Sequence, residues 1–215
     1  MTLFDFFQAE ELPVPAITPT QARDIARNHF GVEAEATALG SQQDANFLLT
    51  GTDGEPIGVL KIANPVFSRI ELEAQDAAAA YITQAEAGVR TATNVQPTGF
   101  PAIAELRSED GGVLYARIIT HLAGGTMSGE QYVTPARAAA LGRLAGRTCR
   151  ALADFDHPGV DRVLQWDLRH ALRTVEVLAP HVSDPHRRDA VEAAAAAAWQ
   201  VVADLSDDLP VQVIH

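Results

Sequence analysis

The sequence of 215 residues is poor in cysteine, lysine and aromatic residues, and it contains no long apolar run. Its single cysteine, Cys149, excludes a disulfide within the chain and a zinc site built from several cysteines. Because about 18 consecutive apolar residues are needed to cross a bilayer, the sequence predicts no membrane-spanning helix. The amino terminus also lacks the positive charge of a signal peptide. We therefore expect a cytoplasmic protein with no membrane partner.

Basic residues are scarce as well. The chain has 16 Lys and Arg against 28 Asp and Glu, which gives a formal net charge of −12 at pH 7. Proteins that bind nucleic acids need a basic surface, so we expect no nucleic-acid partner. The acidity is compatible with a small cationic substrate, and equally with a protein that is merely well solvated. Hydrophobic residues make up 47% of the chain, which indicates a folded protein with a real core.

The first part of the chain combines two helix patterns with short strand patterns. Helices are predicted at 18–30 and 69–87, because Thr18 and Ser68 begin capping boxes and a glycine follows each apolar stretch. Strands are predicted at 36–39, 46–50, 57–63, 102–106 and 113–120. An Asp-Gly pair between the second and third strands indicates a hairpin.

The second part of the chain is mainly helical. Helices are predicted at 134–152, 166–178 and 184–205, followed by a final strand at 211–215. A strand-rich part with one inserted helix, followed by a helical part, predicts an α+β, two-lobed architecture.

Lys61 is the only lysine, because the other 15 basic residues are arginines. It lies in an apolar strand pattern, where an unpaired buried ammonium would cost several kcal/mol, so it needs an anionic partner or an exit to solvent. A chain that otherwise uses arginine indicates a need for a compact ammonium at this position, as in contact with phosphate oxygens. The alternative is a lysine that extends its apolar stem along the surface.

Two acids on the next predicted helix, Glu71 and Glu73, are candidate partners for Lys61. Both flank the apolar face of that helix, so helical geometry alone does not choose between them. Glu71 is explained as the third residue of a capping box, which leaves Glu73 free. The alternative is that both carboxylates are solvated.

Several familiar catalytic motifs are absent. None of the seven histidines forms H-E-x-x-H, and the chain has no G-x-S-x-G, Walker A or G-x-G-x-x-G sequence. The sequence therefore favours neither a metalloprotease, nor a serine hydrolase, nor the common dinucleotide folds. The polar loop at 39–47 is a weak candidate for binding phosphate by itself.

Seven short motifs, taken together, resemble the aminoglycoside phosphotransferase family, especially its hydroxylysine-kinase-like branch. They lie in the family's order at 39–47 (L-G-S-Q-Q-D-A-N-F), 58–62 (G-V-L-K-I), 73–75 (E-A-Q), 117–124, 141–158, 166–168 (W-D-L) and 213–215. The resemblance implies a protein-kinase-like fold. Residues 1–120 would form a nucleotide-binding N-lobe, and residues 121–215 the hinge and an incomplete helical C-lobe.

The resemblance also implies roles for individual residues at the nucleotide. Lys61 would contact the α- and β-phosphates and form an ion pair with Glu73, which favours Glu73 over Glu71. Ser41 and Asn46 would lie near the phosphates, under the loop. The cofactor would be ATP or GTP with Mg²⁺.

The other implied residues belong to the hinge and the catalytic loop. Thr120, His121 and Leu122 would offer backbone groups to the nucleotide base. His215 would begin the catalytic loop as an orienting residue. The sequence ends there, before the family's catalytic Asp and its metal-binding Asn and Asp.

We therefore expect an N-terminal fragment of a small-molecule kinase, inactive by itself and continued by a C-terminal segment. The intact protein would phosphorylate a hydroxyl of a small cationic amino alcohol or an amino-acid-like substrate. The alternative is a non-catalytic kinase-like regulatory or docking domain of a larger protein, such as one linked to a pyridoxal-phosphate aminotransferase.

Overall fold

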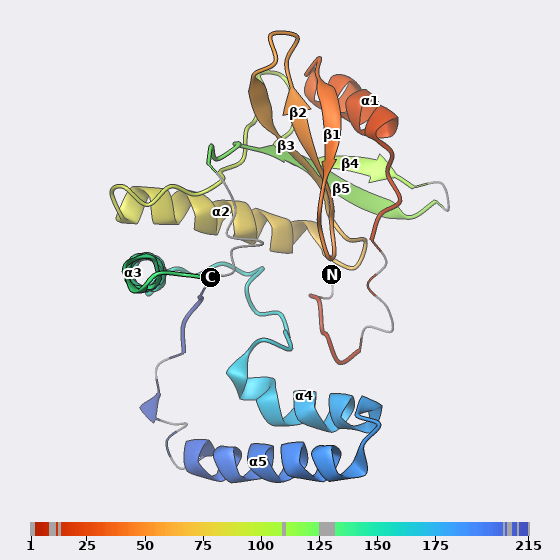
Figure 1. The fold of residues 1–215 in the computed structure, drawn as a ribbon. Coiled ribbons are helices and arrows are strands. Elements are labelled where there is room, and N and C mark those ends of the chain that lie inside the picture. Colours follow the sequence, from red (N-terminus) through yellow and green to blue (C-terminus); the bar gives the residue numbers. More distant parts are fainter. Residues whose placement is uncertain are drawn as a thin grey trace.

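The fold, seen in a computed structural model, is built around one antiparallel sheet (Figure 1). The structure describes residues 3–8, 12, 14–108, 111–124, 132–203, 205, 208–209 and 211–214. The strands are β1 (Glu35–Leu39), β2 (Ala45–Thr50), β3 (Pro56–Ile62), β4 (Ala104–Arg107) and β5 (Val113–Ile119). Their order in the sheet is β1-β2-β3-β5-β4, so β3 lies at the centre.

Helices precede, interrupt and follow the strands. The α-helices are α1 (Pro19–Phe30), α2 (Arg69–Ala85), α3 (Pro135–Ala151), α4 (Ala171–Leu178) and α5 (Pro185–Ala203). Two 3₁₀ turns, Leu168–His170 and Ala179–His181, flank α4. No helix within the described part of the chain is long and apolar enough to cross a membrane.

α1 covers one face of the sheet and confirms the predicted capping pattern. Its N-cap, Thr18, forms a capping box with Gln21, and Gly31 ends the helix with a φ of 66°, a conformation that glycine adopts without strain. Ala22, Ala26 and Phe30 recur every four residues and pack against the apolar side of the strands. This face of the sheet is therefore filled with apolar side chains.

α2 begins at a capping box that confirms the interpretation of Glu71. The Glu71 carboxylate accepts hydrogen bonds from the Ser68 backbone at 2.8 Å and from the Ser68 hydroxyl at 2.7 Å. Its second oxygen accepts the Phe4 backbone N–H at 3.1 Å, and Glu71 is buried. Glu71 is thus fully used at the start of α2.

Residues 3–8 connect the start of α2 to the segment before α4. The Phe6 N–H donates to the Val163 carbonyl at 3.0 Å, and the Val163 N–H donates to the Phe4 carbonyl at 2.9 Å. The Phe4 and Phe67 rings meet edge to face, 5.2 Å apart. These contacts hold the amino-terminal segment against α2.

α3 is tied to the far end of α2. Glu86, which follows α2, accepts hydrogen bonds from Arg147 at 3.0 Å and Arg150 at 2.9 Å. These two arginines lower the pKa of Glu86. Ile82 and Leu152 belong to the apolar cluster beneath these ion pairs.

Two predictions for the helical part need correction. The helix predicted at 166–178 is a 3₁₀ turn followed by α4, because Asp167 caps the turn and leaves Trp166 outside it. The strand predicted at 211–215 is absent from residues 211–214, since no described strand lies beside them to provide hydrogen bonds. Residue 215 lies outside the described residues.

α4 and α5 bury little of their apolar surface. They pack side by side on the far side of α2 from the sheet, and neither contains a buried residue (Figure 1). Large apolar residues are exposed here, namely Leu168, Val177, Leu178, Val191, Val201 and Val202. The apolar core of the molecule therefore lies around the sheet and α2.

Candidate functional site

The face of the sheet opposite α1 carries a row of three polar residues. Asn46, Lys61 and Arg117 are register partners on the adjacent strands β2, β3 and β5. Partners in antiparallel strands project from the same face, so the three side chains lie side by side. Their neighbours along the chain, including Leu60, Ile62 and Ile118, point into the α1 core. Alternation along three strands thus brings this row together.

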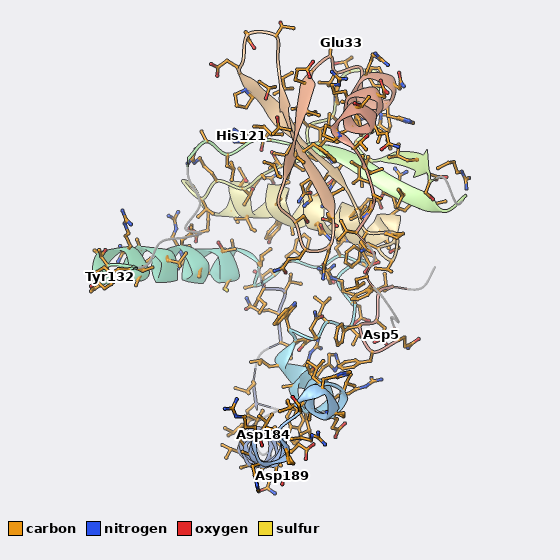
Figure 2. The ribbon with its side chains drawn as sticks, turned by 45° about the vertical axis from the view of Figure 1, so that its right-hand side comes forward. Asp5, Glu33, His121, Tyr132, Asp184 and Asp189 are labelled. Atoms are coloured by element: carbon orange, nitrogen blue, oxygen red, sulfur yellow. The ribbon has the colours of Figure 1, made fainter. Side chains whose placement is uncertain are left out.

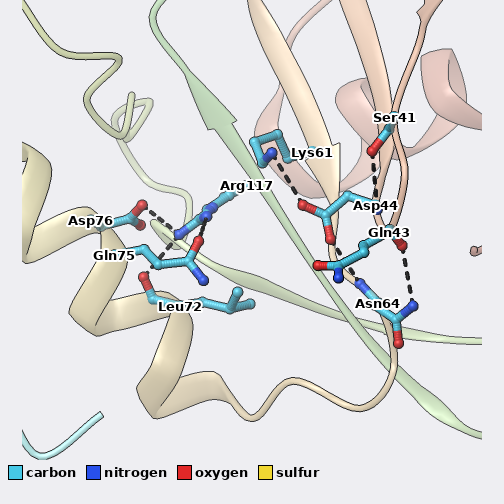
Figure 3. Close-up of polar contacts among 9 residues, drawn as sticks. All are labelled: Ser41, Gln43, Asp44, Lys61, Asn64, Leu72, Gln75, Asp76 and Arg117. Carbon is cyan, nitrogen blue, oxygen red and sulfur yellow. Dashed lines mark hydrogen bonds and ion pairs between the residues drawn. The ribbon is translucent and has the colours of Figure 1, made fainter. Parts of the chain in front are cut away.

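Lys61 forms an ion pair with an acid that precedes β2. Its ammonium lies 3.1 Å from the Asp44 Oδ2, and both side chains are about one-fifth exposed, at 22% and 21% (Figure 3). The other Asp44 oxygen accepts the Asn64 backbone N–H at 3.2 Å. The Asp44 backbone N–H donates to the Ser41 hydroxyl at 3.1 Å. These contacts fasten the loop between β1 and β2 to the end of β3.

Arg117 joins the sheet to α2. Its guanidinium donates to the Leu72 carbonyl at 2.8 Å, to Gln75 at 2.5 Å and to Asp76 at 2.6 Å (Figure 3). Burial lowers the pKa of Arg117, while the carboxylates of Asp76 and Asp44 oppose that shift. Burial also raises the pKa of Asp76, against the opposite effects of Arg117 and Asn94. Arg117 and Asp76 thus form a largely buried ion pair between the sheet and α2, in which each charge stabilises the charged form of the other.

Glu73 does not contact Lys61. It is exposed on α2 and accepts a hydrogen bond from Arg69 at 2.9 Å. Together with Asp76 and Asn94 it lines an open cavity of about 270 Å³ between α2 and the segment before β4. The ion pair Lys61–Glu73 implied by the resemblance is therefore not formed in this structure, in which Glu73 pairs with Arg69 on its own helix.

The segment after β5 carries the residues predicted for the hinge. The Thr120 N–H donates to the Thr93 carbonyl at 2.8 Å, and its hydroxyl accepts the Thr93 N–H at 3.1 Å. His121, which is labelled in Figure 2, and Leu122 are exposed, and no hydrogen bond within the described residues engages their backbone groups. Among the described residues, nothing pairs with the backbone donors and acceptors of His121 and Leu122, whereas the Thr120 N–H is used.

An apolar row lies between the polar row and this segment. Leu48, Val59 and Ile119 are register partners on β2, β3 and β5, two residues from Asn46, Lys61 and Arg117 respectively. They share the face of Lys61, and all three are half-buried. The sheet thus offers an apolar surface next to residues 120–122 and a cationic surface further along the same face.

Two predicted polar contributors lie close to Lys61. Ser41 is exposed and holds the loop through Asp44. The Asn46 Oδ1 is buried and has no hydrogen-bond partner within the described residues, so the position next to Lys61 has an unused acceptor. The chain described here contains no group of three or more His, Cys, Asp and Glu that could hold a metal ion. His215 lies outside the described residues.

Comparison with known families identifies this arrangement. The model of the phosphotransferase enzyme family matches residues 35–215, which include the whole sheet and the polar row. The chain belongs to this phosphotransferase family. A search of curated proteins found no match.

One of two similar solved structures supports the fold that the family match indicates. A microcompartment-associated aminopropanol kinase is similar to this phosphotransferase-family chain with a TM-score of 0.54 and 21% identity, over 72% of this chain and 47% of that chain. An amicoumacin kinase in complex with AMP-PNP, Ca²⁺ and Ami is similar with a TM-score of 0.49 and 20% identity, over 66% of this chain and 42% of that one. The chain spans less than half the length of both kinases. The family match and the aminopropanol kinase together show that the α+β fold is that of kinase-like phosphotransferases, as predicted.

Sequence reasoning did not single out Asp44 or the Arg117–Asp76 pair of this phosphotransferase-family chain. Asp44 stands in the polar loop next to the named Ser41 and Asn46, yet only the register of β2 against β3 places it beside Lys61. The sequence did contain one signal for Arg117. Residues 115, 117 and 119 lie on the same face of the predicted strand, and a charged residue is unexpected within this apolar strand pattern.

Proposed function

We propose that this chain is the nucleotide-binding part of a kinase that transfers the γ-phosphoryl group of ATP to a hydroxyl of a small amino-containing molecule. The observation that supports this best is the position of Lys61. The only lysine of the chain lies on the central strand, half-buried, at the end of an apolar surface that begins at the hinge residues. A nucleotide has the same division into a flat apolar base and an anionic phosphate chain.

The proposed placement follows this division. The base would lie against Leu48, Val59 and Ile119 and use the free backbone groups of His121 and Leu122, with the Thr120 carbonyl beside them. The phosphates would meet the Lys61 ammonium near Ser41 and Asn46. A compact ammonium with three donors suits phosphate oxygens, and charge-assisted hydrogen bonds are the strong ones.

The metal would come with the nucleotide. Mg²⁺ in kinases bridges the phosphates and neutralises the developing charge during transfer. Its protein ligands in this family would follow residue 215, where His215 would orient the catalytic loop. We therefore assign no metal ligand among the described residues and propose ATP with Mg²⁺ as the cofactor; a preference for GTP stays a prediction.

The substrate class rests on charge and on the similar kinase. The net charge of −12 suits a cationic amino compound, because an acidic surface raises its local concentration. The kinase of similar fold is named for aminopropanol, an amino alcohol. We propose a small amino alcohol or an amino-acid-like substrate.

We also propose that a following segment completes the protein. The exposed apolar surface of α4 and α5 and the length of the similar kinases both support a further part that packs on the helical residues. Residues 1–120 would then be the nucleotide-binding lobe, and residues 121–215 the hinge and the beginning of the second lobe. These residues alone would bind nucleotide without turnover.

A non-catalytic docking module is the second candidate, because the exposed apolar side chains of α4 and α5 would also suit a surface that binds another part of a larger protein. The sequence that follows residue 215 separates the two. H-G-D-x-x-x-x-N and a later Asp would support a kinase, whereas loss of these acids would support a docking module. Linkage to an aminotransferase stays a prediction.

A fluorescent ATP analogue, titrated with Mg²⁺ into the 215-residue chain, tests nucleotide binding. Lys61→Ala should weaken binding about tenfold or more, because a hydrogen bond to a charged group contributes about 1.5–3 kcal/mol. Arg107→Ala is the matched control, since this side chain is 71% exposed at the end of β4 and its loss removes the same charge. Equal binding by Lys61→Ala and the control would refute the assignment of Lys61.

A further inference from the structure

We infer that Asp44, in the loop between β1 and β2, is the acid that positions Lys61 for the nucleotide, in place of an acid from α2. This inference rests on the proposed function and concerns the same site. Asp44 touches the lysine and not the reacting atoms, so it is a positioning residue. Three features of the structure carry the argument.

The first feature is that Arg117 uses the polar groups that α2 presents to the sheet. Its guanidinium bonds Asp76, Gln75 and the Leu72 carbonyl. Arg117 is the β5 neighbour of Lys61, and β5 lies between β3 and β4, so Arg117 stands on the α2 side of Lys61 (Figure 3). Arg117, which is larger and more deeply buried than Lys61, therefore pairs with Asp76, the carboxylate of α2 that faces the sheet.

The second feature is the direction of Glu73. This acid forms its ion pair with Arg69, four residues earlier on the same helix, and both side chains are 45% exposed. It lines the open cavity beside α2. Across the described chain, Asp44 is the one acid that forms an ion pair with Lys61. For Lys61 to pair with Glu73, the Glu73 side chain would have to leave Arg69 and reach Lys61 past Arg117, which lies between α2 and the lysine.

The third feature is that Asp44 is itself held in place. One carboxylate oxygen accepts the Asn64 N–H, and the Asp44 N–H donates to Ser41. Asn64 is buried, and its side-chain amide donates to the Gln43 carbonyl at 3.2 Å. The carboxylate therefore has a fixed position before any ligand binds, which lowers the cost of ordering the lysine.

This arrangement leaves Lys61 able to bind phosphate. An ammonium has three donors, so one bond to Asp44 leaves two for phosphate oxygens. Arg117 also interacts electrostatically with Asp44, so two cations offset the carboxylate next to the phosphates. Asp44 would thus orient Lys61 and, through Ser41, fix the loop above the same phosphates.

The test compares binding of a fluorescent ATP analogue with Mg²⁺ by Asp44→Asn, Asp44→Glu, Glu73→Gln and the unmodified chain. We expect Asp44→Asn to bind about tenfold more weakly, Asp44→Glu to recover part of the loss, and Glu73→Gln to bind within twofold of the unmodified chain. Glu35→Gln, an exposed acid on β1, controls for the change in net charge. Equal or tighter binding by Asp44→Asn, or a larger loss in Glu73→Gln, would overturn the inference.

A second readout separates positioning from a general loss of structure. Because Lys61 is the only lysine, lysine labelled with ¹³C at Cε alone gives a single side-chain signal in NMR spectra. This signal should move in Asp44→Asn and stay in place in Glu73→Gln, without nucleotide. An unchanged signal in Asp44→Asn would overturn the inference. If the unmodified chain binds no nucleotide while this signal still moves, the proposed function fails and the contact itself stands.

Discussion

Two cations stand side by side at the centre of the sheet, and their burial separates their roles. Arg117 has a side chain only 6% exposed and spends its donors on α2, whereas Lys61 is 22% exposed and has one acid beside it. A buried guanidinium with a full set of partners holds structure together. A half-buried ammonium with donors to spare can bind a ligand. This difference is why we propose that Arg117 stabilises the fold and that Lys61 binds the nucleotide.

Replacement of Arg117 by alanine should strongly destabilise the chain. The change leaves the half-buried Asp76 carboxylate without its cation, and breaking a buried pair in this way costs up to about 3–5 kcal/mol. Urea unfolding followed by circular dichroism measures the loss. Arg107→Ala, which removes an exposed arginine from β4, should change the free energy of unfolding by less than about 0.5 kcal/mol. Equal losses in the two variants would contradict the structural role of Arg117.

The pH dependence of the Arg117→Ala variant should reveal Asp76. Burial already raises the pKa of Asp76, and the loss of Arg117 removes the largest opposing effect. A carboxyl whose pKa is higher in the folded state than in the unfolded state makes the fold less stable as pH rises through that window. Unfolding free energies of Arg117→Ala should therefore fall from pH 4 towards neutrality (a window set by the usual carboxyl pKa of about 4).

Adding Asp76→Asn to Arg117→Ala should flatten this profile and recover stability at neutral pH, because the uncompensated charge is gone. A double variant as unstable as Arg117→Ala, with the same slope, would show that Asp76 is not the titrating group.

At the scale of elements, α2 is the part that connects the site to the rest of the chain. Arg117 holds its sheet-facing side, Glu71 fixes its start, and Glu86 joins its end to α3. The turn that contains Gly159 also packs against α2. A Cβ added at Gly159 would clash with the Ile70 carbonyl oxygen and lie 2.9 Å from the Ala74 Cβ. A shift of α2 would therefore reach both the polar row and the helical part.

Two glycine-to-alanine changes should have opposite effects. Gly159→Ala introduces a backbone clash with α2 and should destabilise the chain by about 1–3 kcal/mol. Gly142→Ala lies within α3 with open space around it, and should stabilise the helix by about 0.5–1 kcal/mol. Thermal unfolding of both variants beside the unmodified chain measures the difference. If Gly159→Ala were as stable as Gly142→Ala, the close packing of the turn on α2 would be wrong.

Local signals explain which elements could be predicted. The ends of α1 and the start of α2 depend on residues three positions apart, so Thr18, Ser68 and Glu71 were identified from the sequence. The contacts of Lys61 depend on residues 17 positions earlier in sequence and on strand register, which no local pattern encodes. The strand predicted at 211–215 failed for the same reason, because a strand needs a partner that the apolar pattern does not supply.

At the scale of the whole molecule, the two parts of the chain differ in how well they are covered. The sheet has α1 on one face and α2 on the other, and its central strands are well buried. The helical part exposes Trp166 at 78% and Leu168 at 82%. Contiguous exposed apolar side chains mark an interaction surface. This contrast is one of the observations behind our proposal that a further part packs on the helical side.

Charged substitutions on this exposed apolar surface should reduce self-association of the chain without lowering its free energy of unfolding. Trp166→Arg with Leu168→Arg removes two exposed apolar side chains and should lower self-association and the binding of a hydrophobic dye, while unfolding free energy changes by less than about 1 kcal/mol. Sedimentation velocity and dye fluorescence give the two readouts. A large loss of stability, or unchanged association, would contradict the view that these side chains are uncovered.

The central claim, that nucleotide phosphates bind at Lys61, can be measured directly because the chain has one lysine. An amine-reactive reagent, with peptide mass spectrometry, gives the rate of modification at Lys61 and at the terminal amine of the same molecule. With Mg²⁺ and saturating ATP, we expect modification of Lys61 to slow about tenfold or more, because little protein is free of nucleotide at high occupancy and bound phosphates keep the lysine protonated and covered; the terminal amine should react as before. An unchanged rate at Lys61, with nucleotide bound or not, would contradict the account.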